Sequence, residues 1–335
     1  MRTIQYIQAR NNVESVMVGK VVDNDTIQPI KVEGGIYAAA QQAIQAGVGL
    51  AQWVEDNLQP VTVSYQEIVD EGRLLPPMTH PDPSKCLVSG TGLTHLGSAD
   101  TRANMHAQMS ESTEAEMTDT MKIFKLGVEG GKPEKGQTGS LPEWFYKGDG
   151  HSLVAPGSNL TTHGFSLDAG EEPELVGLYL IADDGTPYRL GFAIGNEFSD
   201  HVTEKGNYLW LAHSKLQYSS FGPELLIGDL PEDLVGESAI HRDGKKVWSK
   251  PFLTGEKNMS HSIGNLEHHH FKYSQFCQAG NMHVHYFGTS TLSFGDNFVT
   301  QVGDQFEISI PDFGRSLFNT ISKAQDVGLV TVKAL

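Results

Sequence analysis

The sequence predicts an α+β fold that is mainly β, with a small N-terminal α/β domain ahead of a larger one. Three observations lead to this prediction. Apolar residues recur at helical spacing between positions 36 and 58, as in an amphipathic helix. The segment 75–83 then holds four prolines in nine residues, which indicates an extended linker. From residue 144 onward, short β-rich runs alternate with Gly, Asp and Pro turns, which favours a mainly antiparallel sheet architecture.

Composition narrows the classes of function. The chain has 335 residues, of which 39% are hydrophobic and 19% charged, as in an enzyme-sized globular protein. The 24 Lys and Arg residues stand against 41 Asp and Glu residues, so the net charge of −17 argues against nucleic acid or an anionic membrane as a partner. The N-terminal segment lacks the apolar core of a secretory signal, and we expect a cytoplasmic protein. Cys86 and Cys277 indicate neither a disulfide framework nor a thiolate metal site.

We place a domain boundary at the linker, so that residues 1–75 form the small domain, 76–84 the linker and 85–335 the larger domain. In the small domain we expect a strand over 15–22 and one helix over 36–58. In the larger domain we expect a short strand at 85–88, a polar helix at 103–125 and a surface loop at 127–139. The apolar face of the second helix, which we interpret as packing, comprises Met105, Met109, Met117, Met121 and Phe124.

Three carboxylates crowd the start of an apolar strand. The segment 170–175, GEEPEL, runs directly into the apolar run 175–181. Like charges repel more strongly as they leave water, so such a group either stays solvated at a turn or surrounds a cation. Because side chains alternate between the two faces of a strand, Glu172 and Glu174 project to the same side.

The following residues return a third carboxylate to the same place. The segment 183–187, DDGTP, predicts a turn, and the run 188–194 predicts a strand that comes back beside the first one. Such a hairpin brings Glu197 next to Glu172 and Glu174. Three carboxylates that leave other octahedral positions open suit Mg²⁺ or Mn²⁺ better than zinc. The sequence therefore predicts a metal site made of these three glutamates.

The order of these motifs resembles the fumarylacetoacetate hydrolase superfamily. The matching segments are EPEL at 172–175, GFAIGNEFSD at 191–200, Lys215, FGP at 221–223, FYK at 145–147, HSLVAPGSNL at 151–160, FGTS at 287–290 and VGD at 302–304. The resemblance covers residues 84 to about 320 and implies the mixed β-sandwich and β-roll fold of that superfamily. The segments SGTGLTHLGSADTRANMH and NEFSDHVTEKGNYLWLAHSK are similar to its bacterial sugar-acid branch, which contains dehydratases of 2-keto-3-deoxy-pentonates.

This branch implies a Mg²⁺- or Mn²⁺-dependent lyase of pentose and sugar-acid catabolism. Its reaction would dehydrate a 2-keto-3-deoxy-pentonate through a metal-stabilised enolate and give 2-oxoglutarate semialdehyde. The expected ligand is thus a small 2-oxo acid, and no organic cofactor is required. The resemblance also implies a homodimer.

The resemblance implies roles for individual residues. Lys215 would lie near the enolate, Lys147 would be a second cationic contact, and His95, in a glycine-rich loop, would be a proton shuttle. Substrate contacts would come from two loops, and their residues are Ser89, Thr91, Ser98, Gly288 and Thr289.

Two departures from the family pattern leave alternatives open. Glu197 stands where the family usually has Asp, which should keep metal binding but shift the ion slightly. Ser98 stands where the hydrolases have the Glu that partners a histidine in activating water, and this substitution favours dehydration over hydrolysis. The alternatives are a C–C bond hydrolase of a 2,4-diketo acid and a non-catalytic sugar-acid binding protein.

A second metal hypothesis rests on histidines. Two of them, His283 and His285, would share one face of a strand and could join another imidazole in a zinc site. The full set comprises His261, His268, His269, His270, His283 and His285. The carboxylate site remains the preferred interpretation because its residues match the family motifs.

Overall fold

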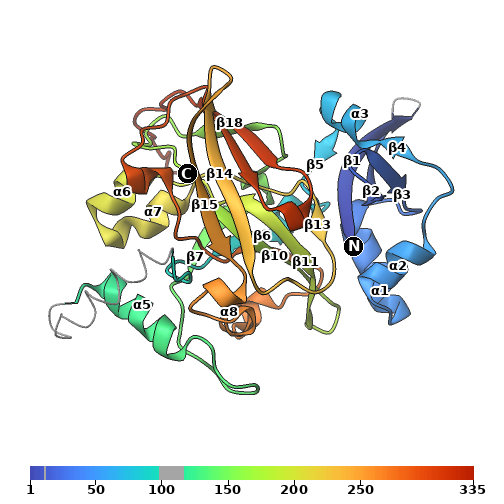
Figure 1. The fold of residues 1–335 in the computed structure, drawn as a ribbon, viewed down its shortest axis with the longest axis horizontal. Helices are drawn as coiled ribbons and strands as arrows, with labels where there is room; N and C mark the ends of the chain where they lie inside the picture. Colours follow the sequence, from blue (N-terminus) through green and yellow to red (C-terminus); the bar gives the residue numbers. More distant parts are fainter. Residues whose placement is uncertain (11–12, 98–116) are drawn as a thin grey trace.

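The computed structural model describes residues 1–10, 13–97 and 117–335 (Figure 1). Two mixed sheets, of thirteen and five strands, form most of the fold. The α+β, mainly β architecture predicted from the sequence is therefore confirmed. Of the helices in these ranges, none combines the length and the apolar character needed to cross a lipid bilayer.

The N-terminal segment forms one end of the molecule (Figure 1). Its elements are β1 (Arg2–Arg10), β2 (Val13–Val21), β3 (Thr26–Pro29), α1 (Gly35–Ala46), α2 (Leu50–Asp56), β4 (Val63–Ser64), α3 (Tyr65–Asp70) and β5 (Leu74–Leu75). The single helix expected over 36–58 is wrong, because the chain forms two helices there. Gly47 adopts a left-handed conformation with φ of 67° and caps α1, which ends the helix. The domain boundary at 76–84 stays a prediction.

The larger sheet carries the acidic segment at its centre. Its main path runs β4-β3-β2-β1-β13-β11-β10-β16-β6-β7. The strands not yet introduced are β6 (Cys86–Gly90), β7 (Phe145–Asp149), β8 (Leu153–Val154), β10 (Pro173–Ile181), β11 (Pro187–Asn196), β12 (Ser219–Phe221), β13 (Leu225–Leu226) and β16 (Met282–Tyr286). Pairing of β1 with β13 joins the N-terminal strands to this sheet.

A second sheet contains the remaining strands, in the order β15-β14-β17-β18-β9. These are β9 (Asn159–Thr162), β14 (Leu234–Arg242), β15 (Lys245–Thr254), β17 (Gln305–Ser309) and β18 (Leu317–Lys323). Most pairs in the two sheets are antiparallel, as expected. The parallel pairs are β6 with β16, β8 with β12 and β9 with β18.

Short helices connect the strands of the larger part. They are α5 (Asp119–Gly130), α6 (His201–Gly206), α7 (Leu211–Lys215) and α8 (Ile263–Phe271). The loop expected at 127–139 is wrong at its start, because α5 continues to Gly130. Gly127 lies so close to His261 that a Cβ atom would sit 2.6 Å from its Nε2, so glycine is used here for close packing. Of the expected apolar face, Met117 and Phe124 are buried, Met121 is half-buried, and Met105 and Met109 lie outside the described residues. Met117 lies before the start of α5 and not on the helix.

The central strand β10 is buried along its whole length. Val176, Leu178 and Leu180 point into one apolar cluster, with residues of α1 and β16. Leu175 and Tyr179 point into a second cluster, with residues of the five-stranded sheet. Burial on both faces explains why the sequence of this strand is continuously apolar rather than alternating.

Truncation of this strand should destabilise the protein strongly. The Leu178 side chain is fully buried, so Leu178→Ala should lower the free energy of unfolding by about 2–5 kcal/mol. The same change at Leu209, which is 84% exposed, is the matched control and should cost less than about 0.5 kcal/mol. Urea unfolding followed by tryptophan fluorescence measures both. Equal losses in the two variants would contradict the position of β10 in the core.

Candidate metal centre

The β10–β11 hairpin brings three glutamates together. Pro173 lies opposite Asn196 in the strand register, and the Glu197 N–H donates to the Glu172 carbonyl at 3.0 Å. One carboxylate oxygen from each of Glu172, Glu174 and Glu197 lies within 4.8 Å of the others, and all three residues are buried. The predicted convergence of the three carboxylates is thus present in the structure.

Asn196 shapes the backbone at this point. Its Oδ1 accepts hydrogen bonds from the Glu172 N–H at 3.2 Å and from the Phe198 N–H at 3.1 Å. The Ser199 hydroxyl donates to the Glu197 carboxylate at 3.1 Å. These contacts fix the first residues of β10 against the end of β11, so the position of Glu197 relative to Glu172 does not depend on a flexible turn.

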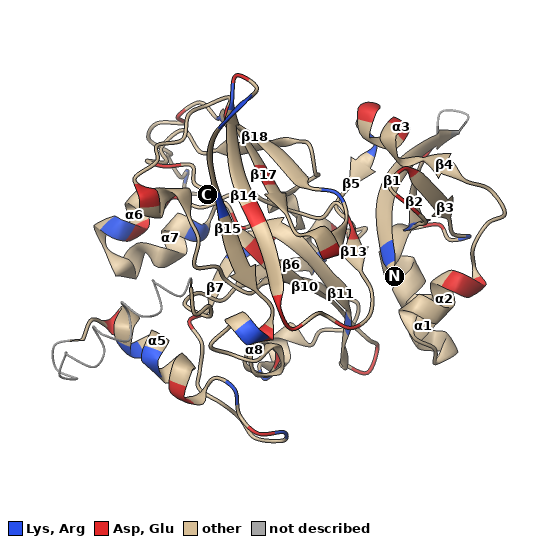
Figure 2. Cartoon of the chain, in the orientation of Figure 1, with Lys and Arg blue, Asp and Glu red and all other residues tan. Residues whose placement is uncertain are grey.

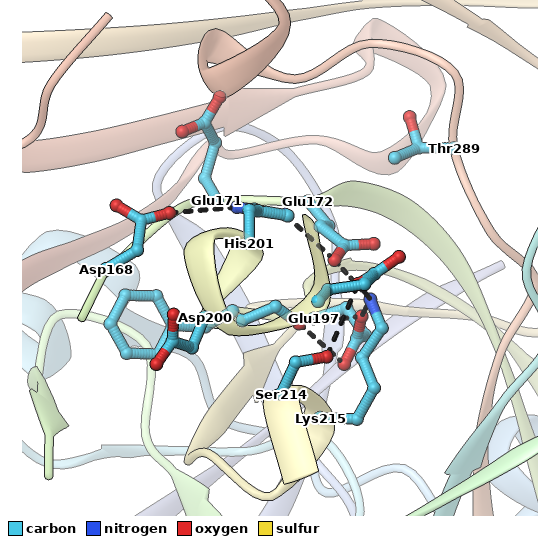
Figure 3. Close-up of polar contacts among 12 residues, drawn as sticks. Asp168, Glu171, Glu172, Glu197, Asp200, His201, Ser214, Lys215 and Thr289 are labelled. Atoms are coloured by element: carbon cyan, nitrogen blue, oxygen red, sulfur yellow. Dashed lines mark hydrogen bonds and ion pairs between the residues drawn. The ribbon is translucent and has the colours of Figure 1, made fainter. Parts of the chain in front are cut away.

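Lys215 lies between two of the carboxylates (Figure 3). Its Nζ donates to Glu172 Oε1 and to Glu197 Oε2, the latter at 2.6 Å. Burial opposes the charge on Lys215, but the two carboxylates outweigh this effect and hold its pKa well above the usual value. Lys215 is therefore a buried cation, as expected from the sequence.

Lys147 is also buried at the centre, on the other side of Glu197. Its Nζ lies 2.6 Å from Glu197 Oε1 and donates to the carbonyl oxygens of Phe198 and Lys215 at 2.7 and 3.0 Å. An ammonium group has three protons, and these three contacts account for all of them. The structure therefore places Lys147 as a support of Glu197 rather than as a group with a free donor for a substrate.

These cations matter because the rest of the molecule is acidic. Figure 2 shows acidic residues on α2, α3, α5 and α6, and basic residues at scattered positions along the chain. With a net charge of −17, the protein can hold an anionic ligand only where positive charge is concentrated locally. The pair Lys147 and Lys215 supplies such charge at the carboxylate centre.

Sequence reasoning did not identify His201, which completes this network. Its Nδ1 lies 3.2 Å from Asp168 Oδ2 and its Nε2 lies 3.1 Å from Glu172 Oε1. Burial acts to lower the pKa of His201, but the hydrogen bonds to Asp168 and Glu172 outweigh it and raise this pKa to about 10. His201 directly follows the motif GFAIGNEFSD (191–200), so its position beside this motif was the available signal.

The three carboxylates differ in their electrostatic environment. Burial acts to raise the pKa of Glu172, but Lys215 and His201 hold it well below the usual range. Burial, followed by the charge of Glu172, raises the pKa of Glu197 to about 7. Burial and the charges of Glu172 and Glu197 raise the pKa of Glu174 well above its usual value. Glu174 pairs with no Lys, Arg or His in the described part of the chain.

This arrangement fits a hard divalent cation. The oxygen donors are of the kind that Mg²⁺ and Mn²⁺ prefer, and Glu174 lacks a positive partner that a dication would supply. Within residues 1–10, 13–97 and 117–335, no other group of three His, Cys, Asp or Glu side chains brings its ligand atoms this close. A metal can therefore be held by Glu172, Glu174 and Glu197.

The histidine cluster has a different organisation. His270 Nε2 lies 2.9 Å from His283 Nδ1, and His270 Nδ1 accepts a hydrogen bond from the Trp144 indole at 3.1 Å. His285 Nδ1 lies 2.9 Å from the Ser89 hydroxyl. Burial lowers the pKa of His283 to about 4 and of His285 to about 3, so both rings are neutral at pH 7. These contacts make the cluster a buried packing unit, and the described residues give the zinc hypothesis no support.

The predicted substrate residues of the first loop are engaged within the protein. Ser89 contacts His285, as described above, and the Thr91 hydroxyl donates to the Tyr286 carbonyl at 3.3 Å. Both residues are buried. Ser98 lies outside the described residues. The structure therefore ties Ser89 and Thr91 to strand β16, and their contact with a substrate stays a prediction.

The second loop lies directly beside the centre. The Gly288 N–H donates to Glu174 Oε2 at 2.7 Å, and a Cβ on Gly288 would sit 2.4 Å from the Thr94 hydroxyl, so only glycine fits. Thr289 is half-buried, and its hydroxyl accepts a hydrogen bond from the Thr291 N–H at 3.3 Å. Figure 3 shows Thr289 apart from the network of charged groups.

His95 is buried next to this loop. Its Nδ1 lies 3.0 Å from the Thr94 hydroxyl and its Nε2 lies 2.9 Å from the Thr254 hydroxyl. Burial lowers the pKa of His95 to about 3, so the imidazole is neutral. Both ring nitrogens contact threonine hydroxyls, and no carboxylate is paired with the ring in the described part of the chain.

Glu143 is a second group that the sequence interpretation missed. It is half-buried, and it accepts a hydrogen bond from the Tyr208 hydroxyl. Its Oε2 lies so close to Gly92 that a Cβ there would clash, which places Glu143 against the glycine-rich loop. Burial raises the pKa of Glu143, and Lys215 and Glu172 are near enough to act on it electrostatically. Glu143 precedes the FYK motif by only two positions, which was the signal available.

Solved structures of other proteins share the fold of this chain. Neither a family model nor a curated protein matches the chain. A 2-keto-3-deoxy-D-arabinonate dehydratase complexed with magnesium and 2,5-dioxopentanoate aligns with 97% of this chain and 100% of its own, with a TM-score of 0.68 and 18% identity. A 5-carboxymethyl-2-hydroxymuconate delta-isomerase from Mycobacterium smegmatis gives the same coverage, with a TM-score of 0.57 and 14% identity. The chain therefore has the fold expected from its resemblance to the fumarylacetoacetate hydrolase superfamily.

Metal binding at this centre should depend on pH. A metal binds the ionised carboxylates, and the pKa of Glu197 is about 7, so below this pH the ion must displace a proton. We expect the affinity for Mg²⁺ to rise between pH 6 and pH 8 and to be accompanied by proton release. Titration calorimetry in two buffers of different ionisation enthalpy measures both. An affinity that is constant over this range would contradict the assignment.

Proposed function

We propose that this protein is a Mg²⁺-dependent hydro-lyase of the fumarylacetoacetate hydrolase superfamily that dehydrates a 2-keto-3-deoxy sugar acid. The observation that carries this proposal is the buried trio Glu172, Glu174 and Glu197 with Lys215 inserted between two of its members. A carboxylate trio combined with a buried lysine suits a small anionic 2-oxo acid, because it offers both a metal site and a fixed positive charge.

The structural neighbours support the choice of reaction. The dehydratase structure contains magnesium and 2,5-dioxopentanoate, and the latter is the compound that dehydration of a 2-keto-3-deoxy-pentonate yields, 2-oxoglutarate semialdehyde. Other neighbours are described as isomerases, including a 2-hydroxyhepta-2,4-diene-1,7-dioate isomerase from Mycobacterium marinum with a TM-score of 0.57 and 15% identity. The pentonate dehydration is our proposal for this chain.

The three glutamates would hold the metal. A dication bound there would supply Lewis-acid stabilisation of negative charge on the 2-oxo group of the substrate. Lys215 holds a fixed positive charge at the same point, and Lys147 and His201 keep the flanking carboxylates in place. Since all these groups are buried, their charges act in a medium of low dielectric constant, where they are stronger than in water.

Dehydration requires two proton transfers. A base removes a proton from C3, the C4–O bond breaks, and the departing hydroxyl takes a proton and leaves as water. A proton then moves from C5 to C3, which leaves an enol at C4 and C5, and transfer of the enol O–H proton to C4 gives the aldehyde. Glu143 and His95 are the candidate groups, because Glu143 is half-buried and His95 buried near the centre and neither is a proposed metal ligand. Burial raises the pKa of Glu143, which suits a carboxyl group that accepts a proton and later returns it.

The surroundings of His95 favour dehydration over hydrolysis. A histidine activates water efficiently when a carboxylate orients it and stabilises its charged form. His95 instead contacts the hydroxyls of Thr94 and Thr254. This observation supports the dehydratase over a C–C bond hydrolase of a 2,4-diketo acid. The cytoplasmic location, the homodimer and the sugar-acid pathway belong to the same proposal.

The metal ligands should be essential for turnover. We expect Glu172→Gln and Glu197→Gln to lower kcat/KM by at least about a hundredfold, because each variant loses a charged ligand. Both variants should keep the wild-type circular dichroism spectrum. The activity is measured by mass spectrometry on a panel of 2-keto-3-deoxy pentonates and hexonates, which lose 18 mass units on dehydration.

The same substrate panel distinguishes the proposed dehydratase from the hydrolase and from the binding protein. A 2,4-diketo acid split into two carbon fragments would identify a hydrolase. Binding of a sugar acid without any chemical change would identify a binding protein. Full activity in the presence of excess chelator would contradict the metal centre itself.

Separate variants should identify the base. Glu143→Gln keeps the size of the side chain but cannot accept a proton, so kcat should fall by about 10²–10⁴-fold while the affinity for Mg²⁺ is unchanged. His95→Gln is the comparison, since its side chain can still contact the two threonines. A larger loss of kcat in His95→Gln than in Glu143→Gln would assign the base to the histidine instead.

A further inference from the structure

The loop between β16 and β17, residues 287–304, carries the predicted substrate contact Thr289. This loop has no strand of its own, although it includes one short 3-10 helix, η6 (Ser293–Asp296). A residue that binds substrate from such a loop needs the loop to be held in place. Some of the hydrogen bonds that hold it come from the acidic segment 170–175, and others join Asp296 to Trp248 and Lys250.

Glu171 makes the firmest of these contacts. Its Oε1 accepts a hydrogen bond from the Ser293 N–H at 2.8 Å, and its Oε2 accepts one from the Ser293 hydroxyl at 2.7 Å. Both residues are almost completely buried, with exposed fractions of 0% and 1%. A carboxylate that binds two donors of one residue fixes that residue in both position and orientation, and such charge-assisted bonds are stronger than neutral ones.

Glu171 is not part of the metal centre. Figure 3 shows its carboxylate turned away from Glu172 and Lys215. This orientation follows from the alternation of side chains, because Glu172 and Glu174 point to one side of the segment and Glu171 to the other. The loop contact Glu171 and the proposed ligands Glu172 and Glu174 thus belong to one short chain segment.

Two further contacts attach the loop to the same network. The Gly288 N–H binds the Glu174 carboxylate at 2.7 Å. The Phe294 ring stacks on the His201 ring with a centroid distance of 5.2 Å, and His201 in turn contacts Glu172. Thr289 therefore lies between two attachment points, Gly288 and Ser293, and both bind glutamates of the segment 170–175.

We propose that Glu171 is a positioning residue for the substrate, because its contact with Ser293 fixes the β16–β17 loop that carries Thr289. The contact between Glu171 and Ser293 is observed in the structure and does not depend on which reaction the protein catalyses. The effect on the substrate rests on the function proposed above.

Hydrogen exchange tests the contact without any substrate. Glu171→Ala and the milder Ser293→Ala should make the backbone amides of 287–297 exchange at least about tenfold faster, because the first removes both hydrogen bonds between Glu171 and Ser293 and the second removes one of them. Glu224→Gln is the matched control. Glu224 is a buried carboxylate that accepts hydrogen bonds from the Arg2 side chain and the Arg315 N–H, at 3.0 and 3.1 Å, and it does not touch this loop. Unchanged exchange in both loop variants would overturn the proposal.

Kinetics test the effect on the substrate. In Ser293→Ala and Glu171→Ala we expect KM for the 2-keto-3-deoxy-pentonate to rise about tenfold. The Mg²⁺ concentration for half-maximal activity should change less than about twofold. Glu171→Gln should be close to wild type, because its amide can accept from the Ser293 N–H and donate to the Ser293 hydroxyl. A loop that exchanges faster while KM stays at the wild-type value would overturn the positioning role.

The two proposals can fail separately. If the wild-type protein does not dehydrate any member of the substrate panel, the proposed function is wrong. The exchange experiment still decides whether Glu171 holds the loop, because it needs neither substrate nor metal.

Discussion

The burial of three carboxylates at one point is the constraint on which the rest of the site depends. Bringing like charges together out of water costs free energy unless positive charge or hydrogen bonds compensate it. The chain meets this cost with Lys215 between Glu172 and Glu197, Lys147 behind Glu197, and His201 beside Glu172. Glu174 pairs with no Lys, Arg or His among the described residues, and a dication bound by the trio would be its positive partner.

The sequence was sufficient to predict the centre because its main geometric relation is local. Glu172, Glu174 and Glu197 belong to one hairpin, and the alternation of strand side chains and a single turn determine how they meet. Lys215 followed from the family motif. The general fold class was also predictable, since the alternation of short apolar runs and turn residues is a local pattern.

The features that sequence reasoning missed depend on contacts between distant segments. Lys147 was expected to face the substrate, but its three donors are used by Glu197, Phe198 and Lys215. The roles of Glu143 and His201 depend on where their loops fold back, which no local pattern specifies. The helix expected over 36–58 divides at Gly47 because the left-handed conformation of that glycine ends α1. In each case, contacts in the folded protein determine the structure that the local sequence pattern does not specify.

The crowding of charge in the segment 170–175 has a physical explanation in this fold. The three glutamates of this segment do not share one function, because successive side chains of an extended chain point to opposite sides. Glu172 and Glu174 face the proposed metal, whereas Glu171 faces Ser293 across the segment. Glu174 also binds the Gly288 N–H, so a single short segment holds both the centre and the loop that approaches it. A shift of this segment along β11 by one residue would exchange the two faces and disrupt both sets of contacts at once. The position of the β10–β11 hairpin within the buried core is thus what keeps the metal ligands and the substrate loop in register with each other.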